Sequence, residues 1–238
     1  MKYNQWISIS DMMAGIMMIF LLIMVSFMLI TQQAQEDLKI QNQKLLALNE
    51  AMSAIAQNYS NLQQELYEAL FKEFSKDLKA WDAYIDEDNT IRFNEPEVLF
   101  DTGKKQVKKR FKDILDDFFP RYVKILSLEK FKDNIEEIRI EGHTSQIWFA
   151  AHSLEERYLG NAELSQARAL EVLKYCFNLK SIDGYKEWLI KVFRANGLSF
   201  AKPLADDEKS RRVEFRVITK ANKDLLKILE ISKDLELK

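Results

Sequence analysis

Residues 6–30, WISISDMMAGIMMIFLLIMVSFMLI, decide how this chain is organised. The 19 residues from position 12 to position 30 carry no charge, and six of the eight methionines lie among them. A helix rises about 1.5 Å per residue, so a run of this length can cross the hydrocarbon core of a bilayer. The stretch predicts a transmembrane helix over residues 11–30, with residues 1–10 as a short cytoplasmic N-terminus.

One carboxylate, Asp11, stands at the start of the apolar run. A charge at the edge of the hydrocarbon core is costly, so an acid here indicates an ion or proton site, or a buried pairing with a partner subunit. The alternative is a solvated first-turn residue that interacts favourably with the helix dipole. Ser8 and Ser10 can support an ion site by hydrogen bonding or by capping the helix.

The composition of the whole chain predicts a single-span protein with a large soluble part. Charged residues make up 30% of the 238 residues, and 35 basic side chains nearly balance 37 acidic ones, so nothing indicates a nucleic-acid partner. Lys2 before the span and Glu36 after it favour a cytoplasmic N-terminus and a periplasmic C-terminal domain. A cleaved signal peptide is the alternative, although the run is longer than usual and lacks a good cleavage site.

No pattern of catalytic residues is apparent. We find no nucleophile beside a base and no phosphate-binding loop, and Cys176 is the single cysteine. His143 and His152 lack a third ligand at the spacing of a metal site. We therefore predict a protein that is not an enzyme and has no metal and no cofactor.

Residues 31–77 are predicted to form a helical stalk. Up to about residue 70 the segment has neither Pro nor Gly and is rich in good helix formers. Its apolar residues recur in steps of three and four, as in the seam of a two-stranded coiled coil, which predicts a homodimer. The seam comprises Ala34, Leu38, Leu45, Leu48, Met52, Ile55, Tyr59, Leu62, Leu66 and Ala69. The alternative is one long amphipathic helix packed on its own domain.

Residues 78–220 are predicted to form an α+β sandwich, and residues 221–238 a C-terminal helical tail. The expected strands are a hairpin within 78–94 and single strands at 135–142 and 211–218. The expected helices lie at 105–126, where Pro120 would break or kink the helix, at 163–177 and at 185–195. In the last strand, Val213 and Phe215 should face inward while Arg212 and Glu214 face outward.

Four segments of this domain resemble the peptidoglycan-binding domain of the OmpA type. They are VLFDTG (98–103), IRIEGHTS (138–145), ELSQARALEVLKY (163–175) and SRRVEFRV (210–217). The membrane stretch resembles the B subunit of flagellar-type, ion-driven stators. Within that group, the segments WISISDMM, FRANGLSF (193–200) and SRRVEFR are similar to the B subunits of Zorya anti-phage defence systems. A flagellar or other stator B subunit is the nearest alternative, and a purely structural peptidoglycan tether is a third.

The resemblance implies a motor subunit of the inner membrane. Asp11 would carry protons, or sodium, through a pore formed with a pentamer of a polytopic A-type subunit around a dimer of this chain. The stator pattern usually has Thr three residues after the Asp, whereas this chain has Ala14, which leaves the ion open. The soluble domain would bind peptidoglycan in the periplasm.

The resemblance also implies the residues of the wall site. In the family, an Asp of a Gly-x-Thr-Asp loop and an Arg of a Leu-Ser-x-x-Arg-Ala helix hold the diaminopimelate of the peptide stem. Arg168 matches the Arg, but Ser145, next to Thr144, stands where the Asp is expected, which removes the anion for the ammonium group. Binding could be weaker, altered, or served by Glu141 or another neighbour. Arg212 in the RRVE element is a further expected contact.

Overall fold

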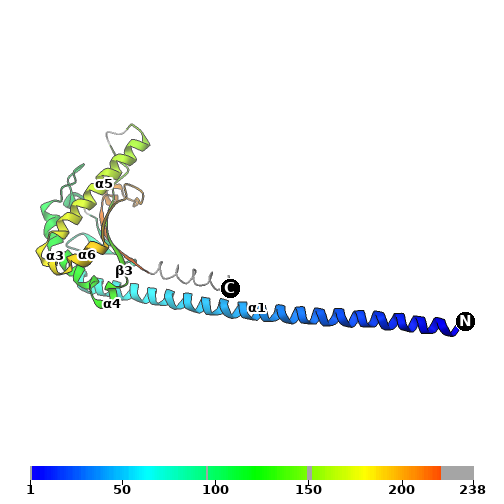
Figure 1. Ribbon diagram of the computed structural model, residues 1–238. Helices are drawn as coiled ribbons and strands as arrows, with labels where there is room; N and C mark the ends of the chain where they lie inside the picture. Colours follow the sequence, from blue (N-terminus) through cyan, green and yellow to red (C-terminus); the bar gives the residue numbers. More distant parts are fainter. Residues whose placement is uncertain (1, 95, 149–151, 221–238) are drawn as a thin grey trace. The chain divides into compact units, whose positions relative to one another are not determined.

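The computed structural model describes residues 2–94, 96–148 and 152–220 (Figure 1). The chain divides into two compact units, one ending at Ala54 and the other beginning at Ile55, and each is described by itself. A single helix, α1 (Lys2–Phe74), contributes to both units. The predicted tail at residues 221–238 lies outside the described residues.

The first unit is helical throughout its described part. Within the described residues, one helix is long and apolar enough to cross a membrane, and its most apolar window has a mean hydropathy of 2.7. The large side chains of this window are exposed on the chain, as Met18 (70%) and Phe20 (68%) illustrate. A helix that is apolar on all sides and unburied fits a lipid or partner environment, so the predicted helix at 11–30 is present.

The apolar residues of α1 are exposed in one part of the helix and buried in another. Leu38 and Leu45 are exposed within one chain, each at 61%. In the second unit, Leu66 and Phe74 belong to the hydrophobic core of the globular domain. The end of α1 is therefore a helix packed on its own domain, and that domain begins before the predicted boundary at residue 78. Because the heptad spacing continues through both parts, the spacing alone does not show where the exposed seam ends and the buried helix face begins.

The second unit is built on a mixed five-stranded sheet with the order β1-β2-β5-β3-β4. Its strands are β1 (Ala83–Ile85), β2 (Ile91–Phe93), β3 (Ile135–Gly142), β4 (Phe193–Gly197) and β5 (Val213–Thr219). The pair β3 and β4 is parallel, and the other neighbours are antiparallel. The predicted hairpin and the predicted strands near 135–142 and 211–218 are thereby confirmed.

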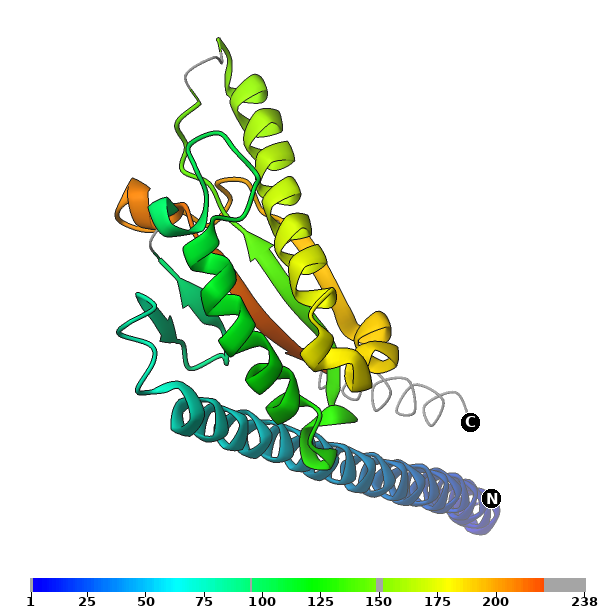
Figure 2. The same cartoon turned by 90° about the vertical axis from the view of Figure 1, so that its left-hand side faces the viewer.

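Two long helices, α3 (Lys109–Leu126) and α5 (Leu154–Phe177), lie on one face of this sheet (Figure 2). Phe118 of α3 is fully buried, and its ring centroid lies 5.3 Å from that of Phe93 and 5.0 Å from that of Phe215. Of the break or kink predicted at Pro120, the break is wrong, because helix α3 continues through this residue. Buried side chains on both sides of Pro120 offset the cost of the missing backbone hydrogen bond.

The segment before the last strand differs from the prediction. The predicted helix at 185–195 is divided into a 3-10 turn (Lys180–Tyr185), the short helix α6 (Lys186–Val192) and strand β4. Phe193 lies opposite Ile138 in the parallel ladder, and both side chains are buried. Residues 193–197 form a strand because they pair with β3, which is far away in the sequence. The local spacing of apolar residues is helical and therefore could not predict this strand.

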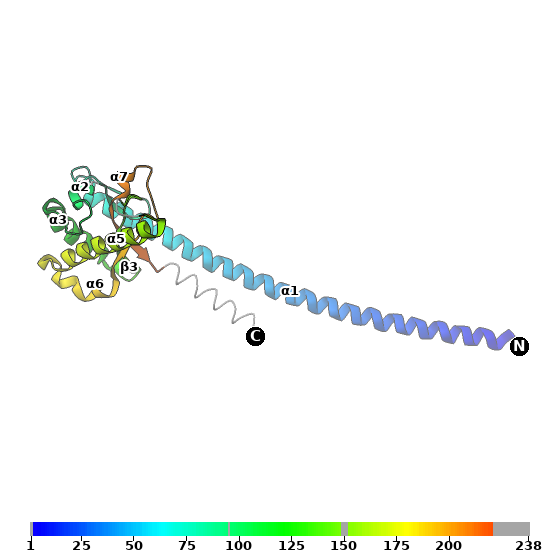
Figure 3. The same cartoon turned by 90° about the horizontal axis from the view of Figure 1, so that it is seen from above.

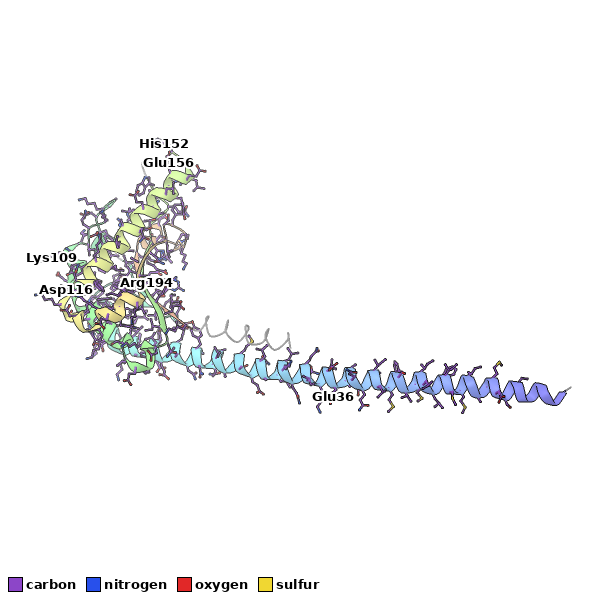
Figure 4. All side chains as sticks on the ribbon, in the orientation of Figure 1. Glu36, Lys109, Asp116, His152, Glu156 and Arg194 are labelled. Carbon is purple, nitrogen blue, oxygen red and sulfur yellow. The ribbon has the colours of Figure 1, made fainter. Side chains whose placement is uncertain are left out.

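Helix α5 also begins earlier than predicted, at Leu154 rather than at residue 163. The hydroxyl of Ser153 accepts a hydrogen bond from the backbone N–H of Glu156. The carboxylate of Glu156 accepts one from the N–H of His152 at 2.7 Å, and Figure 4 labels both side chains at the start of the helix. This reciprocal cap was readable in the sequence as Ser-x-x-Glu.

Among the described residues of the domain, the remaining helices are short: α2 (Pro96–Leu99), α4 (Glu129–Lys132) and α7 (Asp207–Ser210). Seen from above, α2 and α7 lie on the same side of the domain (Figure 3). Gly103, the last residue of VLFDTG, has a φ of +70°, a turn conformation that favours glycine. This turn and α7 approach one another at the pocket described below.

Candidate functional site

A pocket of about 410 Å³ lies at the C-terminal end of β3. Four segments line it: the turn after α2, the loop after β3, helix α5, and the segment from α7 to β5. Its polar lining residues are Thr102, Thr144, Ser145, Asn161, Arg168, Asp207 and Arg211. Ligand sites of proteins are commonly such concave, partly apolar hollows with a few converging polar groups.

Close packing fixes helix α5 beside the pocket. A Cβ atom on Gly142 would lie 2.4 Å from the carbonyl oxygen of Ser165, so only glycine allows the end of β3 to approach the helix this closely. The hydroxyl of Ser165 accepts a hydrogen bond from the N–H of Ser199 at 3.0 Å. Gln166 accepts one from the N–H of Gly197 at 2.7 Å. These contacts hold α5 in register with the sheet, and with it the side chain of Arg168.

Arg168 is 7% exposed and is oriented by backbone carbonyls. Its Nε donates to the carbonyl of Lys104 at 2.9 Å and its Nη2 to that of Asp101 at 3.2 Å, while its Cζ lies 4.9 Å from the ring centroid of Phe100. Burial and the nearby charge of Arg211 lower the pKa of Arg168 to about 10. The group is still a cation at neutral pH, and an anionic ligand would relieve the repulsion between the two guanidinium groups.

Two buried polar side chains of the pocket each have an atom with no hydrogen-bond partner among the described residues. Asn161 is 2% exposed, and no described residue accepts a hydrogen bond from its Nδ2. Thr144 is 3% exposed, and within the described ranges its Oγ1 likewise has no hydrogen-bond partner. Buried polar groups are nearly always hydrogen-bonded, so unsatisfied ones in a pocket indicate a polar ligand.

The structure brings together three of the predicted wall-site residues, Thr144, Ser145 and Arg168. Arg212 is buried and does not line the pocket, whereas its neighbour Arg211 does. Sequence reasoning did not select Asn161 or Asp207. Asn161 lies two turns before Arg168 on the same face of α5. The sequence would have indicated this residue if the helix had been predicted to begin before residue 161.

The predicted ion-site residues lie in the other unit. Asp11 and Ser10 are exposed on α1 within the single chain. The backbone of Ser8 is helical, and its side chain is outside the described structure.

The outer face of the sheet differs from the prediction. Arg212 and Glu214, expected to face solvent, are 3% and 1% exposed. The Nε of Arg212 lies 2.6 Å from Oε1 of Glu214, and the Nε of Arg92 lies 2.8 Å from the same oxygen. A long loop between β4 and β5 runs beside this face, and Arg212 donates to the carbonyl of Lys202 in that loop. This part of the outer face is thus covered, whereas Arg216, farther along β5, is 27% exposed.

Glu214 also belongs to a buried group with Glu141 and His143, whose potential ligand atoms lie within 4.8 Å of one another. Burial raises the pKa of Glu214, but His143, whose Nε2 lies 3.5 Å from Oε2 of Glu214, and Arg212 together hold it well below the usual range. Arg92 and Arg212 both pair with Glu214, so within the described residues this cluster is part of a buried ion-pair network.

The fold and the pocket define a class of protein: an OmpA-type domain in a chain with an apolar N-terminal helix. The sequence model of the OmpA family matches residues 99–214, which include the strands and helices around the pocket. The combination fits a single-pass protein of the inner membrane.

The chain belongs to the family of the Zorya protein ZorB. It is 39% identical over 234 residues to the Zorya protein ZorB of Escherichia coli (Crooks strain), an alignment that covers 95% of this chain and 93% of that relative. The likeness therefore includes the apolar helix, the helical segment after it and the domain.

Solved structures with similar folds include three proteins. The cell wall anchor of the T6SS from Pseudomonas aeruginosa is 23% identical, with a TM-score of 0.44 over 63% of this chain and 96% of that one. A MotB-like protein from Desulfovibrio vulgaris is 22% identical, with a TM-score of 0.42 over 72% and 98%. A periplasmic domain of Helicobacter pylori MotB is 18% identical, with a TM-score of 0.45 over 64% and 97%.

Proposed function

We propose that this chain is the B subunit of an ion-driven, stator-like membrane complex that is anchored to peptidoglycan and acts in anti-phage defence. The observation that carries the proposal is the pairing, in one chain, of a carboxylate at the start of an apolar helix with a domain whose pocket presents two guanidinium groups. Membership of the ZorB family and the match to the OmpA family support the proposal, and no resident cofactor is proposed.

The pocket would bind the peptide stem of the cell wall through its carboxylates. Arg168 offers a planar fork that suits a carboxylate, and its Nε and Nη2 are already held by carbonyls, so the group is preorganised. The Nδ2 of Asn161 is a second donor on the same helix. Binding at this site would hold the complex still relative to the wall while its other part moves.

A pull-down with purified peptidoglycan tests the wall site. We expect the full-length chain in detergent to sediment with peptidoglycan and the Arg168→Ala variant to remain in solution. Arg194→Ala is the matched control, because Arg194 is an exposed arginine of β4 that contacts only nearby carbonyls among the described residues (Figure 4). Equal sedimentation of wild type and Arg168→Ala would refute the role of this pocket.

Asp11 would be the ion carrier of the membrane part. A carboxylate loses a large part of its hydration near the hydrocarbon core, so its protonation can follow the compartment that it faces. Each elementary charge that crosses gains roughly 2.3 kcal/mol per 100 mV, which is enough to bias a conformational step. Ser8 and Ser10 would support this site. Protons are the first choice for the ion and sodium the second.

Substitution of Asp11 separates a motor from a tether. With the partner genes present, we expect Asp11→Asn to abolish protection against phage in a plating assay, at unchanged expression and membrane insertion. Asp37→Asn is the control, since it changes the same chemical group farther along the same helix. Full protection by Asp11→Asn would instead support a structural peptidoglycan tether, in which Arg168 alone is essential.

The assembly would contain two copies of this chain within a pentamer of a polytopic A-type subunit. The exposed seam of α1, with Leu38 and Leu45, supports self-association of the segment that follows the span. In this arrangement the N-terminus is cytoplasmic and the OmpA-type domain is periplasmic. Ion flow would then be coupled to effectors that act on the phage; this chain itself contacts no nucleic acid.

A further inference from the structure

The pocket contains a carboxylate from the segment before β5, which is distant in sequence from Arg168 and Ser145. Asp207, the first residue of α7, lines the pocket together with Arg168 and Arg211. Ser145 also lines it, but a hydroxyl cannot neutralise an ammonium group. Glu141 does not take this place, because it is 3% exposed and belongs to the buried ion-pair network.

The segment that carries Asp207 is held in place by buried groups. Ser210 is fully buried, and its hydroxyl accepts a hydrogen bond from the N–H of Leu204 at 2.9 Å. Arg212 donates to the carbonyl of Lys202 at 3.2 Å and to that of Ser210 at 3.3 Å. These bonds close the segment before β5 into a compact turn, so the position of Asp207 at the pocket is part of the fold.

The pocket contains both positively and negatively charged side chains. Burial and the nearby charge of Arg211 disfavour the cation of Arg168, and a carboxylate beside the two guanidinium groups would offset this. Asn161 adds a buried donor, and Thr144 a buried hydroxyl. Asp207 adds an anion on the wall of the same hollow. A ligand that satisfies all of these groups carries a carboxylate and an ammonium close together.

We propose that Asp207 binds the ammonium group of a zwitterionic amino-acid end in this pocket, and so determines which peptide stems the domain accepts. The inference rests on the proposed wall-binding function and assigns Asp207 the role that Ser145 cannot perform. The carboxylate of the same ligand end binds Arg168 and Asn161. Arg212 acts as a positioning residue, because it holds the turn that carries Asp207.

Two synthetic tripeptides test the assignment. The first is alanyl-γ-glutamyl-diaminopimelate with its free carboxylate and free ammonium; the second is identical except that hydrogen replaces the free amino group. Binding of both to the full-length chain in detergent is measured by calorimetry. We expect the wild type to prefer the first tripeptide, and Asp207→Asn to lose roughly fivefold in affinity for it while its affinity for the second stays unchanged.

Asp206→Asn is the matched control, because this neighbouring acid is exposed and does not line the pocket. It should keep the wild-type preference, and Arg168→Ala should bind neither tripeptide. If Asp207→Asn keeps the full preference for the ammonium-bearing tripeptide, the assignment of Asp207 is overturned while wall binding stands. If the wild type binds neither tripeptide, the proposed wall site itself fails, and the inference fails with it.

Discussion

Replacement of Glu214 by Gln should destabilise the OmpA-type domain strongly. The side chain is 1% exposed, and its Oε1 lies 2.6 Å from Nε of Arg212 and 2.8 Å from Nε of Arg92. Gln retains the shape but not the charge, so Arg212, which is 3% exposed, becomes a buried cation without a counter-ion. Removal of one partner of a buried ion pair costs about 3–5 kcal/mol, which lowers the Tm of a domain of this size by about 10 °C.

The pH dependence gives this prediction a second, independent readout. The pKa of Glu214 is well below the usual range in the folded domain, so its stabilising contribution is present above the pKa of an unfolded glutamate, roughly 4.3. It is lost as the pH falls from there toward the folded-state pKa. The difference in Tm between the wild type and Glu214→Gln should therefore be largest near neutral pH and shrink below about pH 4.

Thermal unfolding of the full-length chain in detergent, followed by tryptophan fluorescence, measures both effects. Glu137→Gln is the control: Glu137 pairs with Arg139 at 2.6 Å on the same sheet, but their side chains are 28% and 34% exposed, so the loss should stay below about 1 kcal/mol. A Tm for Glu214→Gln within about 2 °C of the wild type, with the same pH profile, would show that the buried ion pair contributes no net stability.

Three further substitutions test the packing. Leu45→Asn, in the exposed part of the seam, should weaken dimer formation in chemical cross-linking without changing the Tm of the domain; unchanged cross-linking would contradict the dimer. Leu66→Ala should lower the free energy of unfolding of the domain by about 2–5 kcal/mol in denaturant titrations, because this side chain is 2% exposed in the core. Tyr122→Phe should leave the free energy of unfolding unchanged or raise it by up to about 1 kcal/mol. The reason is that the hydroxyl of Tyr122 is fully buried and has no hydrogen-bond partner among the described residues. A decrease in the free energy of unfolding of about 1 kcal/mol or more would disprove this prediction.

Much of the domain was predictable because its elements have local signals. The strand at 135–142 has Ile138 and Ile140 on one face, and both are fully buried in the structure. The hairpin expected within 78–94 is present as β1 and β2, and Gly103, with a φ of +70°, forms the turn after α2. In these places propensity, alternation and turn residues agree, so the sequence pattern was sufficient.

The errors occurred where a distant partner overrides the local pattern. Strand β4 was predicted as the end of a helix, and only its parallel pairing with β3 makes it a strand. Arg212 and Glu214 alternate with apolar residues, as on a half-exposed strand, yet each is the counter-ion of the other in a covered network. An alternating pattern predicts exposed charges because burial of a single charge costs solvation free energy. Pairing with an opposite charge offsets that cost, so paired charges can be buried.

For the candidate site, the sequence by itself determined the membrane helix with its one carboxylate, the helix that carries Arg168, and the absence of an acid at Ser145. These follow from hydrophobic run length, helical spacing and residue identity, which are local properties. Only the tertiary structure decided that Arg211 rather than Arg212 lines the pocket, and that Asp207 joins Arg168 there. The physical reason is that the position of Asp207 depends on buried hydrogen bonds of Ser210 and Arg212 to backbone groups of the preceding loop, and no spacing in the sequence encodes such contacts.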